Sequence, residues 1–371
     1  MMRRIFLSAL ICISAGRALA VPQITVLDYN VSGNGVADWS TNSAQVKAIG
    51  REIQYLNPDI ITFQEIPLTN TWQMANWVKV FMPGFYLATN SGTDGYIRST
   101  IASRFPINRS TSWMSRSNLA YFGYNGSFTR DLFEAEIAVP GFSQPLHVFT
   151  THLKSGSTTT DALRRAAEAA AISNFLVTVF LPGNAAPYFL TGDMNEDIAR
   201  PTSAGYLPIQ TLTSAPTGLR LTSPVNPVTG TNLTISIQTT LDARFDYIMP
   251  CGALFSNLVS SQVFRTDLLT NFSSNLFSND DLTASDHLPV VMTFANPFNT
   301  PFRLLAFCRT NQTVWLKWES ATNRVFSVET SGDLAQWTPL ATNLFSTGTN
   351  FVFTTNQVSD PVKFFRIYRV P

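Results

Sequence analysis

Acids, amides and imidazoles recur in this chain at the ends of apolar, strand-like runs. His152 ends the run that starts at Leu146, and Asp286-His287 stands directly ahead of the run that starts at Val290. Asn30, Glu65, Asp193, Asn195 and Asp246 stand at the ends of other runs. Because ligands bind at the edge of a sheet where strands end, we expect these side chains to meet in a single cleft.

These residue types suit the metal-assisted hydrolysis of a phosphoester. The carboxylates of Glu65 and Asp286 and the amide of Asn30 supply oxygen ligands, which Mg²⁺ and Mn²⁺ prefer. Zinc is less favoured, because the sequence contains no His-x₃-His pair and no cysteine cluster. A bound cation of this kind would neutralise the charge that develops on the phosphate oxygens.

The remaining side chains suit proton transfer and phosphate binding. Asp246 would orient His287 and stabilise its imidazolium, while His287 takes a proton from the attacking water. Asp193 and Asn195 are two residues apart on a turn, so both would face the phosphate and the water. His152 would hydrogen-bond a phosphate oxygen or protonate the leaving oxygen.

Strands and helices alternate around these positions. Strand-like runs cover residues 24–30, 60–63, 85–88, 100–103, 132–139, 146–152, 188–191, 244–249 and 290–294, and apolar spacing predicts helices over 43–56, 72–81 and 160–180. The apolar face of the last helix would consist of Leu163, Ala166, Ala167, Ala170, Phe175 and Leu176. Residues 199–240 read as long loops. His147 lies inside its strand, five residues before His152, so it points to the opposite face and we interpret it as structural.

Six short motifs follow one another along the chain in an order that is typical of a known family. They are Tyr29-Asn30-Val31, Gln64-Glu65, Thr151-His152-Leu153, Gly192-Asp193-Met194-Asn195, Phe245-Asp246-Tyr247-Ile248 and Ser285-Asp286-His287. Residues 21–295 thereby resemble the endonuclease/exonuclease/phosphatase superfamily. The resemblance implies an α/β fold of four layers, with two mixed sheets face to face and helices outside. It also implies a divalent metal and the roles given above, and Arg130 resembles a basic phosphate contact of relatives.

The resemblance also helps to choose a substrate class. His152 is similar to the first catalytic histidine of the pancreatic-type DNase and bacterial sphingomyelinase branches, whereas Ser32 stands where the apurinic-site endonucleases carry an Asp. We therefore expect a nuclease that acts on DNA or RNA. A sphingomyelinase-like phospholipid phosphodiesterase is the alternative, because the aromatic segment 122–128 could enter a membrane, although the same rings could stack on bases. A catalytically silent binding module is a third possibility.

The first 20 residues have the composition of a secretory signal. Arg3-Arg4 precede an apolar stretch from Ile5 to Ser14, and Ala18-Leu19-Ala20 resembles a cleavage site. No later stretch is long and uncharged enough to span a membrane. We therefore expect a secreted protein, extracellular or periplasmic. Removing residues 1–20 takes away three arginines and no acid, which lowers the net charge from +1 to −2 and argues against nucleic-acid binding by overall charge alone.

The end of the chain differs in composition from the rest. Residues 296–301 have the composition of a linker, and residues 302–371 contain short strands at regular spacing with no evident helix, which predicts a small β-sandwich. We expect this part to take no role in catalysis. Cys251 and Cys308 fall on either side of the linker, and the sequence leaves open whether they pair. It also leaves the oligomeric state open.

Overall fold

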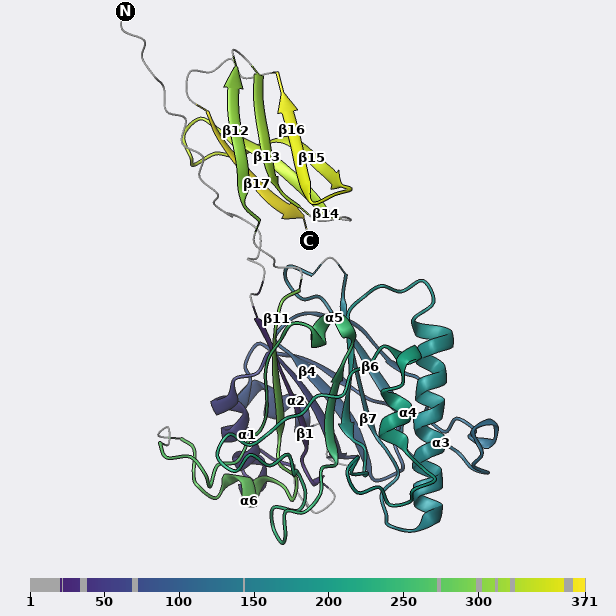
Figure 1. Ribbon diagram of the computed structural model, residues 1–371. Coiled ribbons are helices and arrows are strands. Elements are labelled where there is room, and N and C mark those ends of the chain that lie inside the picture. Colours follow the sequence, from purple (N-terminus) through teal and green to yellow (C-terminus); the bar gives the residue numbers. More distant parts are fainter. Residues whose placement is uncertain are drawn as a thin grey trace, which may run out of the picture. The chain divides into compact units, whose positions relative to one another are not determined.

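The computed structural model describes residues 21, 23–33, 39–68, 73–142, 144–271, 275–297, 302–310, 313–320, 324–356 and 363–370. The predicted signal segment 1–20 and residues 298–301 of the predicted linker lie outside these ranges. The chain divides into two compact units, one within residues 22–139 and 144–297 and the other within residues 140–143 and 298–371 (Figure 1).

The larger unit contains a six-stranded mixed sheet in the order β10-β11-β1-β2-β4-β3. Its strands are β1 (Gln23–Asn30), β2 (Ile60–Pro67), β3 (Tyr86–Thr89), β4 (Ile97–Ser103), β10 (Leu258–Val263) and β11 (Val290–Ala295). Only the neighbours β1 and β2 run parallel within this sheet. Their carboxyl ends therefore lie side by side, and these are the ends that carry Asn30 and Glu65.

A five-stranded mixed sheet in the order β5-β6-β7-β8-β9 forms the other half of the sandwich. Its strands are β5 (Ile107–Ser112), β6 (Leu132–Ile137), β7 (Leu146–His152), β8 (Tyr188–Asp193) and β9 (Asp246–Pro250). Again one neighbouring pair is parallel, β7 with β8, and their carboxyl ends carry His152 and Asp193. Each sheet thus contains one parallel pair of strands, and the carboxyl ends of both pairs carry candidate site residues.

Buried polar side chains join the two parallel pairs across the sandwich. Gln64 of β2 donates to Thr150 Oγ1 of β7 at 3.0 Å, and Thr191 of β8 contacts Thr62 of β2 through their hydroxyls at 2.9 Å. Asp28 of β1 accepts from Thr62 and Gln64 through its Oδ1 at 2.7 and 2.8 Å. Because these bonds satisfy groups that are shielded from water, they fix how the strand ends of one sheet face those of the other.

Helices cover the outer faces of both sheets (Figure 1). α1 (Ala44–Leu56) and α2 (Gln73–Phe81) pack on the first sheet, where Ile49, Ile53 and Trp77 join a core with Phe63. α3 (Thr159–Phe175) packs on the second sheet, with Phe149 of β7 against Phe175. The other helical segments are η2 (Ala120–Phe122), η3 (Leu176–Phe180), α4 (Pro208–Leu212), η4 (Ala215–Thr217), α5 (Gly252–Phe255) and α6 (Asp280–Ala284). The predicted four-layer α/β fold is confirmed.

The smaller unit is a sandwich of two three-stranded antiparallel sheets, β12-β13-β16 and β15-β14-β17. Its strands are β12 (Leu304–Thr310), β13 (Thr313–Glu319), β14 (Arg324–Ser331), β15 (Thr338–Ser346), β16 (Asn350–Thr355) and β17 (Phe364–Val370). Trp318 lies at the centre of its core, 4.9 Å from the ring of Phe351 and 5.5 Å from that of Phe326. The unit therefore has a core of its own, as expected for a small β-sandwich.

Several details differ from the sequence-based expectations. The helix expected over 160–180 is α-helical only to Phe175 and ends in a π-helical turn. Residues 199–240 are not loops throughout, since they contain α4 and η4, and β10 was not expected at all. Cys251 and Cys308 are both free thiols. Within the described residues, no helix is long and apolar enough to cross a membrane.

Candidate active site

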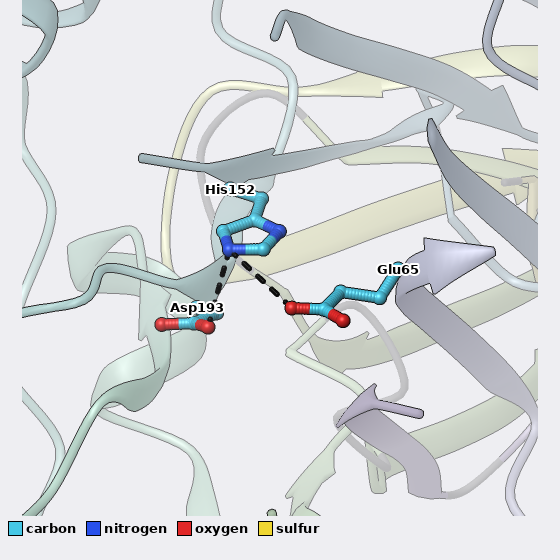
Figure 2. Close-up of side chains that lie close together, drawn as sticks. All are labelled: Glu65, His152 and Asp193. Carbon is cyan, nitrogen blue, oxygen red and sulfur yellow. Dashed lines mark ion pairs between the residues drawn. The ribbon is translucent and has the colours of Figure 1, made fainter. Parts of the chain in front are cut away.

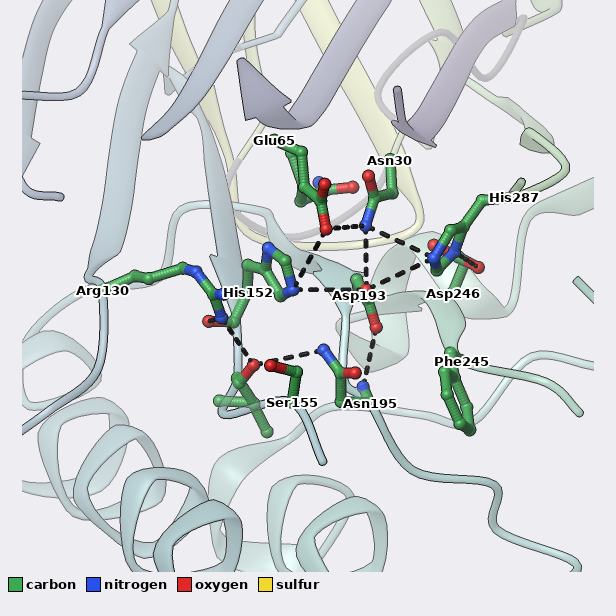
Figure 3. Close-up of polar contacts among 12 residues, drawn as sticks. Asn30, Glu65, Arg130, His152, Ser155, Asp193, Asn195, Phe245, Asp246 and His287 are labelled. Atoms are coloured by element: carbon green, nitrogen blue, oxygen red, sulfur yellow. Dashed lines mark hydrogen bonds and ion pairs between the residues drawn. The ribbon is translucent and has the colours of Figure 1, made fainter. Parts of the chain in front are cut away.

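Six strand ends deliver their polar side chains to one place between the two sheets (Figure 3). Asn30 ends β1, His152 ends β7 and Asp193 ends β8, while Asp246 begins β9. The pairing of the second sheet sets His152 beside Asp193 and Asp193 beside Asp246. Glu65 and His287 join them from β2 and from the turn before β11. The side chains that were expected to meet therefore lie together in one cluster.

Asn30 connects the two halves of this cluster. Its side-chain nitrogen donates to Asp193 Oδ2 at 2.9 Å and to Glu65 Oε1 at 3.2 Å, and it lies 3.5 Å from His287 Nε2. Its amide oxygen accepts from the backbone N–H of Ser32 at 3.0 Å, which fixes the orientation of the amide. Asn30 is therefore the neutral link that holds two carboxylates of different sheets close together.

Glu65 owes its position to an irregular backbone. The pairing of β2 with β4 shifts register between Phe63 and Ile66, and Glu65 in this bulge has φ 61°, where a side chain is unfavourable. Gly33 packs against it so closely that a Cβ there would lie 1.9 Å from the Glu65 carbonyl oxygen. A bulge re-aims a side chain next to an active site, and here it turns Glu65 towards His152 and Asp193.

Glu65, His152 and Asp193 form a group of candidate metal ligands (Figure 2). One ligand atom from each lies within 4.8 Å of the others, and His152 Nε2 is 3.3 Å from Asp193 Oδ2 and 4.0 Å from Glu65 Oε1. Burial raises the pKa of the Glu65 carboxyl, and it raises the pKa of Asp193 to about 7. The raised pKa values reflect the cost of burying two carboxylates together, a cost that a bound cation would offset, and their oxygens with the imidazole nitrogen form a donor set that fits a divalent cation.

His287 and Asp246 form a buried pair next to this group. His287 Nδ1 lies 2.9 Å from Asp246 Oδ2, and His287 Nε2 lies 3.7 Å from Asp193 Oδ2. Burial works against the charged imidazole, but the charges of Asp246 and Asp193 outweigh it and raise the pKa of His287 to about 10. Asp193, Asp246 and His287 also lie close enough to offer a second group of candidate ligands.

The turn after β8 is built to carry two functional side chains. Gly192 has φ 137°, and a Cβ there would lie 1.8 Å from the carbonyl oxygen of Thr151, so β7 and β8 can pair closely only with glycine at this position. Asn195 donates its backbone N–H to Asp193 Oδ1 at 2.7 Å and its side-chain amide to the Leu153 carbonyl at 3.2 Å. The turn and the end of β7 are thereby tied together.

Three further residues singled out in the sequence are not part of the contacting cluster: Arg130, Asp286 and His147. Arg130 is not a free surface side chain: it donates to the Leu153 carbonyl at 2.9 Å and pairs with Asp94 at 3.0 Å. Asp286 is half-buried, and its carboxylate is in neither group of candidate ligands found among the described residues, although its charge acts on Glu65 and His287. His147 lies apart, with its Nδ1 2.5 Å from Glu134 Oε1.

Two positioning residues escaped the sequence analysis. Ser285 donates its hydroxyl to the Asn30 carbonyl at 2.7 Å and accepts the backbone N–H of His287 at 3.1 Å. Thr234 accepts the backbone N–H of Asp246 at 3.3 Å and, through its carbonyl, that of Leu288 at 2.8 Å. Ser285 stands inside a recognisable motif, so its place could have suggested a role. Thr234 lies in a Thr-rich loop that carries no such signal.

Comparisons with known proteins agree with this geometry. The model of the Endonuclease/Exonuclease/phosphatase family matches residues 29–287. No curated protein matches the sequence. Similar solved structures include truncated TDP2 from Caenorhabditis elegans, with 18% identity, a TM-score of 0.50 and coverage of 74% of this chain and 98% of that chain. A family protein from Leptotrichia buccalis has 16% identity, a TM-score of 0.50 and coverage of 73% and 99%. One from Bacteroides vulgatus has 13% identity, a TM-score of 0.51 and coverage of 73% and 98%.

Proposed function

Because the chain belongs to the endonuclease/exonuclease/phosphatase family, and is therefore a metal-dependent phosphoester hydrolase, we propose that it is a secreted phosphodiesterase that cleaves nucleic acid. The observation that carries the proposal is the group of Glu65, His152 and Asp193, with ligand atoms within 4.8 Å of one another, beside the His287–Asp246 pair. This arrangement combines a cation site with a buried imidazole that can move a proton.

Glu65 and Asp193 would hold the cation, with Asp286 as a further carboxylate near them. Asn30, whose amide nitrogen rather than its oxygen faces these two carboxylates, would keep them in place. When bound, Mg²⁺ or Mn²⁺ would neutralise these carboxylates and the charge on the phosphate oxygens. With the charge of Asp193 neutralised, only Asp246 and Asp286 of these acids would still favour the imidazolium of His287, and the pKa of His287 would fall. His287 can then accept a proton at Nε2 from water, while Asp246 keeps hold of Nδ1.

His152 is suited to a different task. Burial, with the nearby charges of Arg130 and His287, holds the pKa of His152 well below its usual value, so the ring is neutral at physiological pH. Its Nε2 faces Asp193 and Glu65, and its Nδ1 has no hydrogen-bond partner among the described residues. A neutral imidazole here can donate a hydrogen bond to a phosphate oxygen, beside the positive charge of Arg130.

The aromatic segment that could serve a membrane favours the nucleic acid substrate instead. Phe128 is only 2% exposed and Phe122 is half-buried, and the guanidinium of Arg164 lies over the ring of Tyr124, 5.4 Å from its centroid. Tyr121, directly ahead of this segment, is 88% exposed. A single exposed tyrosine suits stacking on a base better than insertion into lipid.

The test is a substrate comparison under one set of conditions. The protein would be incubated with plasmid DNA, single-stranded DNA, RNA, sphingomyelin vesicles and bis-p-nitrophenyl phosphate, first with Mg²⁺ or Mn²⁺ and then with EDTA. We expect cleavage of nucleic acid that EDTA abolishes. Release of choline phosphate from the vesicles without cleavage of any nucleic acid would instead assign the phospholipid reaction. Detection of the mature amino terminus after residue 20 in the medium or periplasm of an expressing cell would test secretion.

A further inference from the structure

Helix α3 buries two charged side chains. Arg165 and Glu168 are both 0% exposed. The expected apolar face was partly wrong at this point, because Leu163, Ala166 and Ala170 are only half-buried while these two charged residues face inward. A buried charge is unfavourable unless it is paired and hydrogen-bonded. The hydrogen-bond partners of Arg165 and Glu168 therefore indicate the structural role of these two charges.

Arg165 makes its bonds to two loops that follow strands of the site. Its Nη1 donates to the carbonyls of Lys154 at 3.0 Å and Gly156 at 2.7 Å. Its Nε donates to Glu196 Oε2 at 2.8 Å, and its Nη2 donates to the hydroxyl of Thr202 at 2.8 Å. The fork of one guanidinium therefore joins the loop after β7 to the turn after β8.

Glu168 holds the first of these loops from the other side. Its Oε2 accepts the backbone N–H of Lys154 at 2.8 Å, and its Oε1 accepts the backbone N–H of Thr129 at 2.7 Å. Lys154 is thus fixed at its N–H by Glu168 and at its carbonyl by Arg165. Two opposite charges, three residues apart on one helix, clamp a single residue of the loop.

Each clamped segment carries a residue of the candidate active site. Lys154 follows His152 by two residues, Glu196 follows Asn195 directly, and Thr129 precedes Arg130 directly. We propose that Arg165 and Glu168 are positioning residues for the proposed hydrolysis, which set the segments bearing His152, Asn195 and Arg130 in their mutual positions. The inference rests on the proposed function for its catalytic consequence but not for its structural one.

The three histidines of the chain allow a test that is independent of activity. Long-range ¹H–¹⁵N spectra of the imidazole rings report His147, His152 and His287 separately in metal-free protein. Arg165→Gln should shift the resonances of His152 while those of His147 stay in place. Arg109→Gln is the matched control, since Arg109 also pairs with a buried acid, Glu134, at 3.1 Å.

The control should give the opposite pattern. Glu134 also binds His147 Nδ1, so Arg109→Gln should shift the resonances of His147 and leave those of His152 unchanged. A folded Arg165→Gln protein with unchanged His152 resonances and unchanged turnover would overturn the proposal. If Arg165→Gln does not fold, Glu168→Gln, which keeps the shape of the side chain, is measured instead and judged by the same two outcomes.

Kinetics then separate a positioning role from a general loss of stability. With bis-p-nitrophenyl phosphate, Arg165→Gln and Glu168→Gln should lower kcat by about 10- to 100-fold at temperatures where both proteins are fully folded, because small displacements of reacting groups are costly. Arg165→Lys should recover part of the loss, and Arg109→Gln should have normal kcat. Equal losses of kcat in Arg165→Gln and Arg109→Gln would contradict the inference. A wild-type protein without phosphodiesterase activity would refute the proposed function but leave the imidazole spectra as a valid test.

Discussion

His287 Nδ1 lies 2.9 Å from Asp246 Oδ2, in a pair that is buried between the two sheets. The charge of Asp246 is the largest influence that raises the pKa of His287, to about 10, against the effect of burial. In the metal-free protein His287 is therefore an imidazolium at neutral pH. Its use as a base depends on the balance of charge among Asp246, Asp193 and a bound cation.

Asp246→Asn should lower the pKa of His287 and reduce turnover by about 10²- to 10⁴-fold, as expected when a general base loses its orienting carboxylate. An imidazole NMR titration measures the first effect and steady-state hydrolysis the second. Asp28→Asn is the matched control: Asp28 is also a fully buried acid, but its Oδ1 accepts hydrogen bonds from Thr62 and Gln64 rather than contacting His287. A normal His287 titration in Asp246→Asn would show that the pair does not set its protonation.

Cation binding should become tighter as the pH rises through 7. The pKa of Asp193 is raised to about 7, so at lower pH a proton competes with the cation for this carboxylate. Between pH 6 and pH 8 the apparent affinity for Mn²⁺ should rise about tenfold, the ratio that a single pKa near 7 gives. Calorimetry in two buffers of different ionisation enthalpy would also count the released protons. Asp193→Asn should bind weakly with little pH dependence; an unchanged pH dependence would exclude Asp193 as the competing group.

Glu52 should make the fold less stable as the pH rises. This residue is fully buried, receives a hydrogen bond from Tyr29 at 2.7 Å, and has its pKa raised to about 8 by burial. Between about pH 4.5, where the unfolded carboxyl titrates, and pH 8, the folded state holds a proton that the unfolded state has lost. The free energy of unfolding then falls by at most ~1.4 kcal/mol per pH unit from this group.

Glu52→Gln removes this titration while keeping the shape of the side chain. The variant should match the wild type near pH 4.5 and exceed it in denaturant midpoint near pH 9. Urea unfolding at pH 5, 7 and 9 measures the difference. A constant difference between the two proteins over this range would show that Glu52 titrates normally in the folded protein.

Ending the chain after Ala295 should leave hydrolysis intact. Both sheets of the larger unit, and every residue of the candidate active site, precede that position. The smaller unit has its own core around Trp318 and Phe326, and the described core cluster around Phe63 in the larger unit contains none of its residues. Turnover and thermal unfolding of the shortened protein would be compared with those of the full chain. Loss of activity in a folded truncation would assign the β-sandwich a part in catalysis.

The strand-end residues could be predicted because their signal is local. Each of Asn30, Glu65, His152 and Asp193 follows an apolar run in the sequence, and a strand places its final side chain at the edge of its sheet. Contacts between distant segments carry no such signal. The link from Asn30 to Asp193 joins residues of different sheets, and it depends on the packing of the two parallel strand pairs.

Other features were missed because they contradict the local pattern. Arg165 and Glu168 occupy inward positions of a helix where apolar residues were expected, and only their bonds to three loops explain their burial. Glu65 was itself predicted, but the bulge with positive φ that turns it towards the site was not. In these cases contacts between distant segments outweigh the local preference of the chain, so a local pattern does not reveal them.

The most direct test of the central claim is the rate of phosphodiester hydrolysis as a divalent cation is returned to the EDTA-treated protein. Bis-p-nitrophenyl phosphate would be the substrate, and Mg²⁺ and Mn²⁺ would be titrated separately for the wild type and for Glu65→Gln. We expect no hydrolysis before the cation is added, full recovery in the wild type, and at least a ~10-fold higher cation requirement in Glu65→Gln. Hydrolysis that survives EDTA, or an identical cation requirement in the two proteins, would contradict a cation site built on Glu65.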